Sequence, residues 1–290
     1  MDESLSDWLA VREPADLTAR SATLVERVRH ALASTDTVRG LDLCTGTGSN
    51  LRYLIDRLPG RQTWLAADRD ARLLEELPTK LKTWADAHGY SMRTEGQVSS
   101  LRGGRCECDV ETRAMDLDRL DAGLFEGRNL VTASALLDLV SDEWLQRLVV
   151  EIAARRLPFY AALSYDGRVE MTPADSADKK IIAAVNAHQR IDKGFGPALG
   201  PTAAAAAVER FERVGYSVLQ GQSDWVFAPH DREIQLEMLS GWAAAARDVD
   251  DVPLPDVIGW LKRRRDLVVA GQSSTRVGHT DLFARPTATR

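Results

Sequence analysis

Apolar residues recur along the first half of the chain at two spacings, one typical of helices and one of short buried strands. Residues 8–32 have the helical spacing, with charged residues in between. Strand-like runs and helical stretches then alternate. The predicted strands are 38–44, 63–67, 106–114, 129–133 and 159–164, and the predicted helices between them are 49–58, 70–88 (with Pro78 as a kink or break) and 142–155. This alternation predicts an α/β fold in which a mostly parallel sheet carries helices on both faces.

The pattern changes after residue 165, where helices dominate. A loop rich in glycine and proline is expected at 192–201. The expected helices are 177–190, 202–214, 231–247 and 254–268, and the expected strands are 216–227, with an interruption, and 279–284. We therefore divide the chain into an N-terminal helical segment, 1–34, and one domain, 35–290, with helical cap insertions at about 170–200 and 229–268.

Composition and charge exclude several classes of protein. Apolar residues make up 44% of the 290 residues and charged residues 28%, which is too apolar for a disordered chain. The 37 basic and 43 acidic residues give a net charge of −6, which argues against a broad nucleic-acid surface. The acidic start lacks a signal-peptide pattern, and no apolar stretch is long enough for a membrane helix. We expect a cytoplasmic protein that does not bind membranes.

The three cysteines do not indicate a disulfide framework or a metal site. Their odd number in a chain of this length is typical of reduced thiols. Cys106 and Cys108 would share one face of a strand, but no histidine lies near them in sequence. We predict no metal ligands and interpret both as packed side chains.

The most informative segment is 41–50, in which a strand ends in a turn with two glycines and a helix begins. Gly46 and Gly48 allow the backbone to approach a ligand closely and to adopt positive φ. About twenty residues later the second strand ends in Asp68, whose carboxylate suits ribose hydroxyls. These features predict a nucleoside-bearing cofactor at the carboxyl edge of the sheet.

Two cofactor classes fit this arrangement. A dinucleotide site requires a third glycine, but position 51 is leucine. Asp42, just before the turn, suits a cationic ligand better than a pyrophosphate, because like charges repel. The sequence thus favours a cationic cofactor over NAD(P), although an NAD(P)-dependent reductase remains an alternative.

The segment resembles the first motif of the class I S-adenosylmethionine-dependent methyltransferases, an acid followed by a glycine-rich turn. Residues 42–48 match this motif except at Cys44, which replaces the first glycine. The resemblance covers about 35–165 and implies a Rossmann-like, doubly wound sheet, mostly parallel, with a C-terminal antiparallel strand near 278–283. It also implies S-adenosylmethionine as the cofactor, bound by Asp42, Cys44, Thr45, Gly46, Gly48, Asn50, Asp68, Arg69, Asp116, Leu117 and Ser134.

Candidates for the methyl-acceptor side follow the fifth predicted strand, where ligands of open sheets bind. Tyr165 and Asp166 come directly after that strand, and His188 lies in a stretch hinged by glycines. We predict Tyr165, Asp166 and His188 as catalytic groups, with His188 as the base. Arg190 and Lys193 would bind an anionic group of the substrate and Phe195 would stack on it. The alternative for this stretch is a solvated helix end and a flexible loop.

The predicted function is an S-adenosylmethionine-dependent methyltransferase that acts on a small molecule, with an anionic acceptor as one option. Residues 133–136 lack the proline-aromatic motif of methyltransferases that modify base amino groups. The acceptor atom is left open, and so is a homodimer. A non-catalytic regulatory protein that binds the same cofactor is the main rival, because the sequence shows no clear catalytic constellation.

Overall fold

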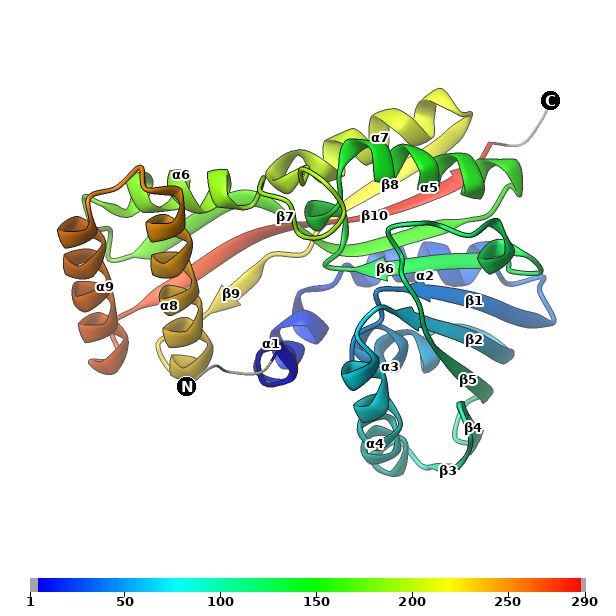
Figure 1. Ribbon diagram of the computed structural model, residues 1–290. Coiled ribbons are helices and arrows are strands. Elements are labelled where there is room, and N and C mark those ends of the chain that lie inside the picture. Colours follow the sequence, from blue (N-terminus) through cyan, green and yellow to red (C-terminus); the bar gives the residue numbers. More distant parts are fainter. Residues whose placement is uncertain (1–4, 288–290) are drawn as a thin grey trace.

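The computed structural model describes residues 5–287, whose strands form one sheet with helices on both faces (Figure 1). Across the sheet the strand order is β3-β4-β5-β2-β1-β6-β7-β10-β8, and β9 pairs with β10. The strand bounds are β1 Thr37–Leu43, β2 Arg61–Asp68, β3 Tyr90–Glu95, β4 Val98–Gly103, β5 Glu107–Ala114, β6 Leu130–Ser134, β7 Phe159–Thr172, β8 Tyr216–Gln222, β9 Trp225–Phe227 and β10 Ser274–Pro286. Strands β5, β2, β1, β6 and β7 are parallel, and β10 is antiparallel between β7 and β8. The predicted fold class is confirmed.

The helices agree with the predicted pattern except at the N-terminus. Their bounds are α1 Leu5–Ala19, α2 Ala22–Ala31, α3 Ser49–Ile55, α4 Ala71–Ala87, α5 Asp142–Ala154, α6 Asp178–His188, α7 Ala203–Arg213, α8 Arg232–Val249 and α9 Leu254–Val269, with 3-10 turns η1 Ala122–Phe125, η2 Leu137–Leu139 and η3 Gly200–Thr202. The single helix expected over 8–32 is two helices, because Ser21 caps α2 by accepting from the amide of Leu24. Pro78 lies inside α4 and does not end it.

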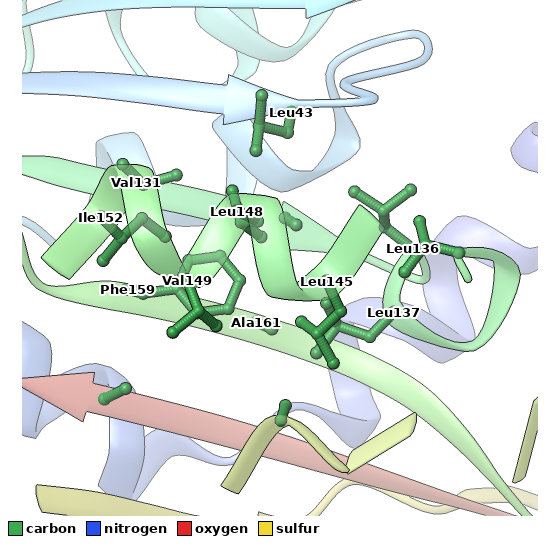
Figure 2. Close-up of a cluster of buried hydrophobic side chains, with 14 of the residues drawn as sticks. Leu43, Val131, Leu136, Leu137, Leu145, Leu148, Val149, Ile152, Phe159 and Ala161 are labelled. Atoms are coloured by element: carbon green, nitrogen blue, oxygen red, sulfur yellow. The ribbon is translucent and has the colours of Figure 1, made fainter. Parts of the chain in front are cut away.

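The central strands are buried on both faces, as parallel strands are in doubly wound folds. In β2, Leu65 and Ala67 belong to one hydrophobic cluster, whereas Trp64 and Ala66 belong to the other. Figure 2 shows the first cluster, in which apolar residues of α5 pack against β6 and β7. Helices α2, α3 and α4 contribute to the second cluster. The two clusters fix the sheet and therefore the position of its carboxyl edge.

Strands β7 and β10 continue well beyond the central sheet and carry a helical extension at one end of the molecule (Figure 1). Helices α6, α8 and α9 pack there around Trp260. Asp178 accepts hydrogen bonds from Trp260 (2.9 Å) and from the Nε of Arg264 (3.0 Å). The extension includes helices from both stretches that the sequence marks as insertions.

Candidate active site

The glycine turn between β1 and α3 has the left-handed backbone that the motif requires. The φ angles are 51° at Cys44, 55° at Gly46 and 82° at Gly48. A Cβ at Gly48 would lie 2.9 Å from the Cγ of Leu77, and one at Gly46 would lie 3.3 Å from Leu9. Cys44 thus adopts the conformation of the glycine it replaces, at a cost of about 1 kcal/mol. The turn remains tight despite this substitution.

Asp42 is enclosed by the turn that follows it. Its carboxylate accepts hydrogen bonds from Thr45 (2.6 Å), Asn50 (2.6 Å) and Thr132 (2.7 Å), and no part of the residue is exposed. Burial raises the pKa of Asp42, although the three donors oppose this effect. The carboxylate therefore ties β1 to β6 and to the start of α3.

The acids predicted for ribose and adenine lie where β2 and β5 end. Asp68 accepts from the backbone amides of Gly46 (2.8 Å) and Asp70 (2.9 Å) and is nearly buried. Asp116 is exposed and borders a surface pocket of about 580 Å³ together with Arg69 and Asp70. The two strand ends therefore form a common site, as expected for neighbouring parallel strands.

The predicted residue Leu117 directly follows Asp116 but does not line this pocket. Its side chain is buried in the core, and its carbonyl oxygen accepts from the indole nitrogen of Trp144 (2.7 Å). Phe195 packs edge-on against the same Trp144 and is 6% exposed. The core covers most of the ring, and stacking of Phe195 on a substrate stays a prediction.

Arg20 also lies at this site, although no motif in the surrounding sequence indicates it. Its guanidinium donates to Asn50 and to the hydroxyl of Ser134 (3.0 Å), and it lies over the ring of Tyr53. Arg20 is 5% exposed, and its Nε has no hydrogen-bond partner among residues 5–287. Within that range no ion pair joins it to a carboxylate. Its charge acts at longer range on the buried carboxylates of Asp16 and Asp42, while its direct hydrogen bonds go to neutral side chains.

The position of Arg20 depends on the last strand of the sheet. Asp281 of β10 accepts from the backbone amide of Ser21 (2.9 Å), the residue directly after Arg20. The other carboxylate oxygen of Asp281 accepts from the amide of Leu163 in β7 (2.8 Å). The N-terminal segment is thereby fixed to two strands of the sheet.

The predicted acceptor-side residues lie in two groups. Tyr165 is buried and donates to Asn186 of α6 (2.8 Å), while Asp166 forms an ion pair with Arg168 (2.5 Å). Burial raises the pKa of Tyr165. Both residues follow the part of β7 that lies beside β6, at the carboxyl edge. Their partners hold them in place, and a catalytic role for either stays a prediction.

His188 and Lys193 form the second group, at the end of α6 and in the loop after it. The imidazole lies 3.3 Å from the Lys193 amine and 3.5 Å from an oxygen of Asp248. Burial, followed by the charge of Lys193, lowers the pKa of His188. Arg69 contacts the carbonyl of Lys193 (3.2 Å), which connects this loop to the end of β2. Arg190 is exposed. Base and anion-binding roles for these residues stay predictions.

Helix α1 covers the carboxyl edge of the sheet. Leu9 lies over Gly46, Glu13 pairs with Arg52 of α3 (2.7 Å), and Asp16 accepts from Trp225 of β9 (3.0 Å). Among the described residues of this helix, Leu5–Ala19, only Asp16 is fully buried. Helix α1 is therefore held by these polar contacts and by partly buried apolar side chains, among them Trp8, which packs edge-on against Trp225.

Two further buried groups under α1 were not predicted from the sequence. Asp138 of η2 is 6% exposed, and its Oδ1 has no hydrogen-bond partner among the described residues. His279 of β10 is 5% exposed and contacts the carbonyl oxygen of Val277 (3.1 Å). Arg12 of α1 acts electrostatically on both. They widen the site from the glycine turn toward β7 and β10.

Two features are not found in the described range, a metal-binding cluster and a membrane-spanning helix. In residues 5–287, no group of three or more His, Cys, Asp or Glu side chains is arranged to hold a metal ion. No helix in that part of the chain is long and apolar enough to cross a membrane.

Comparisons with known proteins give structural neighbours only. No family model and no curated protein sequence matches the chain. Solved structures similar to it include YcgJ from Bacillus subtilis, with 10% identity over 92% of this chain and all of that one, TM-score 0.46. A second is a SAM-dependent methyltransferase from Thiobacillus denitrificans in complex with S-adenosyl-L-homocysteine, with 12% identity over 98% of this chain and all of that one, TM-score 0.43.

A third similar structure is the cyclopropane synthase MmaA2 from Mycobacterium tuberculosis, with 9% identity over 98% of this chain and 86% of that one, TM-score 0.43. At these identities the likeness concerns the fold alone. The strand order, with five parallel strands and β10 inserted antiparallel between β7 and β8, defines a Rossmann-like, doubly wound sheet. The chain therefore has the Rossmann-like fold predicted from its sequence, mostly parallel with a C-terminal antiparallel strand.

Proposed function

We propose that this protein is an S-adenosylmethionine-dependent methyltransferase that acts on a small molecule. The observation that carries the proposal is Arg20, a buried guanidinium bonded to neutral side chains at the glycine turn, with a free Nε. A carboxylate ligand would accept a charge-assisted hydrogen bond from this Nε. The methionine part of the cofactor ends in such a carboxylate, so the residues present fit it.

Each part of the site has a role in this proposal. Gly46 and Gly48 supply the positive-φ backbone of the turn, against which Leu77 and Leu9 pack closely. Arg20 with Ser134 would bind the amino-acid carboxylate. Asp68 and Asp116, at the ends of β2 and β5, would bind the ribose and the adenine. When bound, S-adenosylmethionine supplies an electrophilic methyl group. Asp42 acts indirectly, because its contacts with Thr45 and Asn50 hold the turn in shape.

The alternatives have less support. A pyrophosphate at this turn would lie near the buried carboxylate of Asp42, and the position of the third glycine holds the fully buried Leu51. A regulatory protein without turnover shares the cofactor site proposed here. Transfer of a labelled methyl group to small-molecule acceptors would distinguish an enzyme from it.

The test compares three nucleoside ligands by calorimetry. S-adenosylhomocysteine should bind the wild-type protein, and Arg20→Met should weaken it by about 30-fold or more, because a charged hydrogen-bonding partner is lost. Methylthioadenosine lacks the amino-acid part, so its affinity should not change in the variant. NAD should not compete.

The matched control is Arg29→Met, which removes an exposed arginine that pairs with Glu26. It should leave both affinities unchanged. A folded wild-type protein that binds no S-adenosylhomocysteine would overturn the proposed function. Equal loss of both ligands in Arg20→Met would instead show that Arg20 only supports the fold.

A further inference from the structure

Asp138 lies on the part of the carboxyl edge that the cofactor residues leave unused. It follows β6 directly, in η2, and the backbone amide of Tyr165 in β7 faces its carboxylate. The proposed cofactor contacts lie on the other side, at β1, β2 and β5. In an open sheet ligands bind outside the carboxyl ends of the strands. Asp138 therefore lies on the acceptor side of the proposed methyltransferase site.

The surroundings of Asp138, within the described residues, leave one oxygen of its carboxylate without a partner. Oδ1 is buried and accepts no hydrogen bond in the described part of the chain. Burial raises the pKa of Asp138 to about 6, against the opposing effects of the backbone amides of Asp138 and Tyr165 and of Arg12. The charged or ionisable groups facing it are Arg12 from α1 and Tyr165 from β7. Arg12 is already paired with Asp16 (3.1 Å).

Helix α1 lies near Asp138, and its Arg12 acts electrostatically on the carboxylate. Trp8, Val11 and Ala15 of this helix pack against the cluster that contains Trp225, so a ligand that reaches Oδ1 displaces apolar as well as polar contacts. A ligand that offers a hydrogen-bond donor to Oδ1 would compensate for the lost contacts. Near neutral pH the carboxylate is mainly ionised and accepts such a bond strongly.

We propose that Asp138 binds the proton-bearing group of the methyl acceptor through Oδ1. The acceptor is then a small molecule that presents an N–H or O–H group, an amine or a hydroxyl compound, at the carboxyl edge between β6 and β7. This inference rests on the proposed function and assigns to Asp138 a role in acceptor choice. It adds a site residue beyond those predicted from the sequence.

Sinefungin tests this proposal without knowledge of the natural acceptor. In this analogue of the cofactor a carbon bearing an amine replaces the sulfonium and its methyl group, so it places N–H donors at the acceptor side. Wild-type protein at about pH 8 should bind sinefungin about tenfold more tightly than S-adenosylhomocysteine. Asp138→Asn should remove most of this preference while S-adenosylhomocysteine still binds.

Two controls keep the test independent of folding defects. Asp142→Asn removes an equal charge from an exposed residue of α5 that pairs with Arg210, and it should retain the preference. In the wild-type protein the preference should fall several-fold from about pH 8 to about pH 5, as Asp138 takes up a proton. This second measurement requires no variant.

The outcomes separate the two proposals. If neither ligand binds the wild-type protein, the proposed function fails. If both bind, but the preference is absent, insensitive to pH or unchanged in Asp138→Asn, the role of Asp138 fails and the cofactor site stands. A preference that depends on Asp138 and on pH supports the proposal.

Discussion

The candidate site has two halves: the glycine-turn half, around Asp42, and the acceptor half, around Asp138. Each half contains a buried carboxylate, but the two carboxylates differ in their hydrogen-bond partners. Asp42 in the glycine-turn half receives three side-chain hydrogen bonds. Asp138 in the acceptor half has one oxygen without a partner in the described residues. Burial raises the pKa of both. The difference indicates that Asp42 holds the shape of the turn, whereas Asp138 has an oxygen available to a ligand.

The largest expected effect comes from removing Asp42. Asp42→Ala should lower the free energy of unfolding by about 4 kcal/mol, because the donors of Thr45, Asn50 and Thr132 lose a buried acceptor. Urea denaturation near pH 7 measures it. Asp142→Ala, at an exposed position, should cost less than about 0.5 kcal/mol. A similarly small loss for Asp42→Ala would show that the two halves do not differ as described.

Because of His279, the stability of the folded protein should fall at acid pH. Burial lowers the pKa of His279 to about 4, from 6.5 in the unfolded chain. Below about pH 6.5 the unfolded chain therefore binds a proton that the folded protein does not, and stability falls until about pH 4. The expected loss is about 3 kcal/mol.

Unfolding curves measured between these pH values, for wild type and His279→Gln, check this prediction. The charged groups that act on the imidazole are Arg12, which lowers its pKa, and Asp166 and Asp224, which raise it. The variant should lose most of the dependence on pH. Equal slopes for the two proteins would contradict the burial of a neutral imidazole.

Asp138→Asn should produce a smaller effect of opposite sign to that of Asp42→Ala. Because the folded-state pKa is raised to about 6, ionisation destabilises the folded protein as the pH rises from about 4 to 6. At about pH 8 the neutral amide should raise the free energy of unfolding by about 2 kcal/mol. The gain should vanish near pH 4, where the wild-type carboxyl is neutral. Thermal unfolding across this range checks it, and a loss at pH 8 would contradict it.

The sequence predicts the central sheet well because its strands are buried on both faces and read as apolar runs. It misses the hairpin of β3 and β4, whose residues are largely exposed, and it shortens β7, whose outer part alternates with polar residues such as Asp166 and Arg168. Periodicity detects burial, so strands that are partly exposed give a weak signal.

The glycine turn and the acids at the strand ends are also predictable, since chain order places them at one edge. The roles of Arg20, Asp138 and His279 cannot be predicted in this way, because each depends on a contact with a residue distant in sequence. These contacts are with Ser134, Tyr165 and Trp225, respectively. The one available signal for Asp138 is an acid shortly after the fourth predicted strand. For Arg20 nothing in the local pattern distinguishes it from a surface arginine.

The hydrogen bond between the Ser21 amide and Asp281 has a consequence for folding during synthesis. The two residues are 260 positions apart, and the strand that carries Asp281 is inserted between β7 and β8. Arg20 therefore leaves the ribosome early but reaches its final position only after residue 281 has been synthesised. Until then the glycine turn lacks the guanidinium of Arg20. Nascent chains that end before residue 281 should therefore not retain nucleoside ligands.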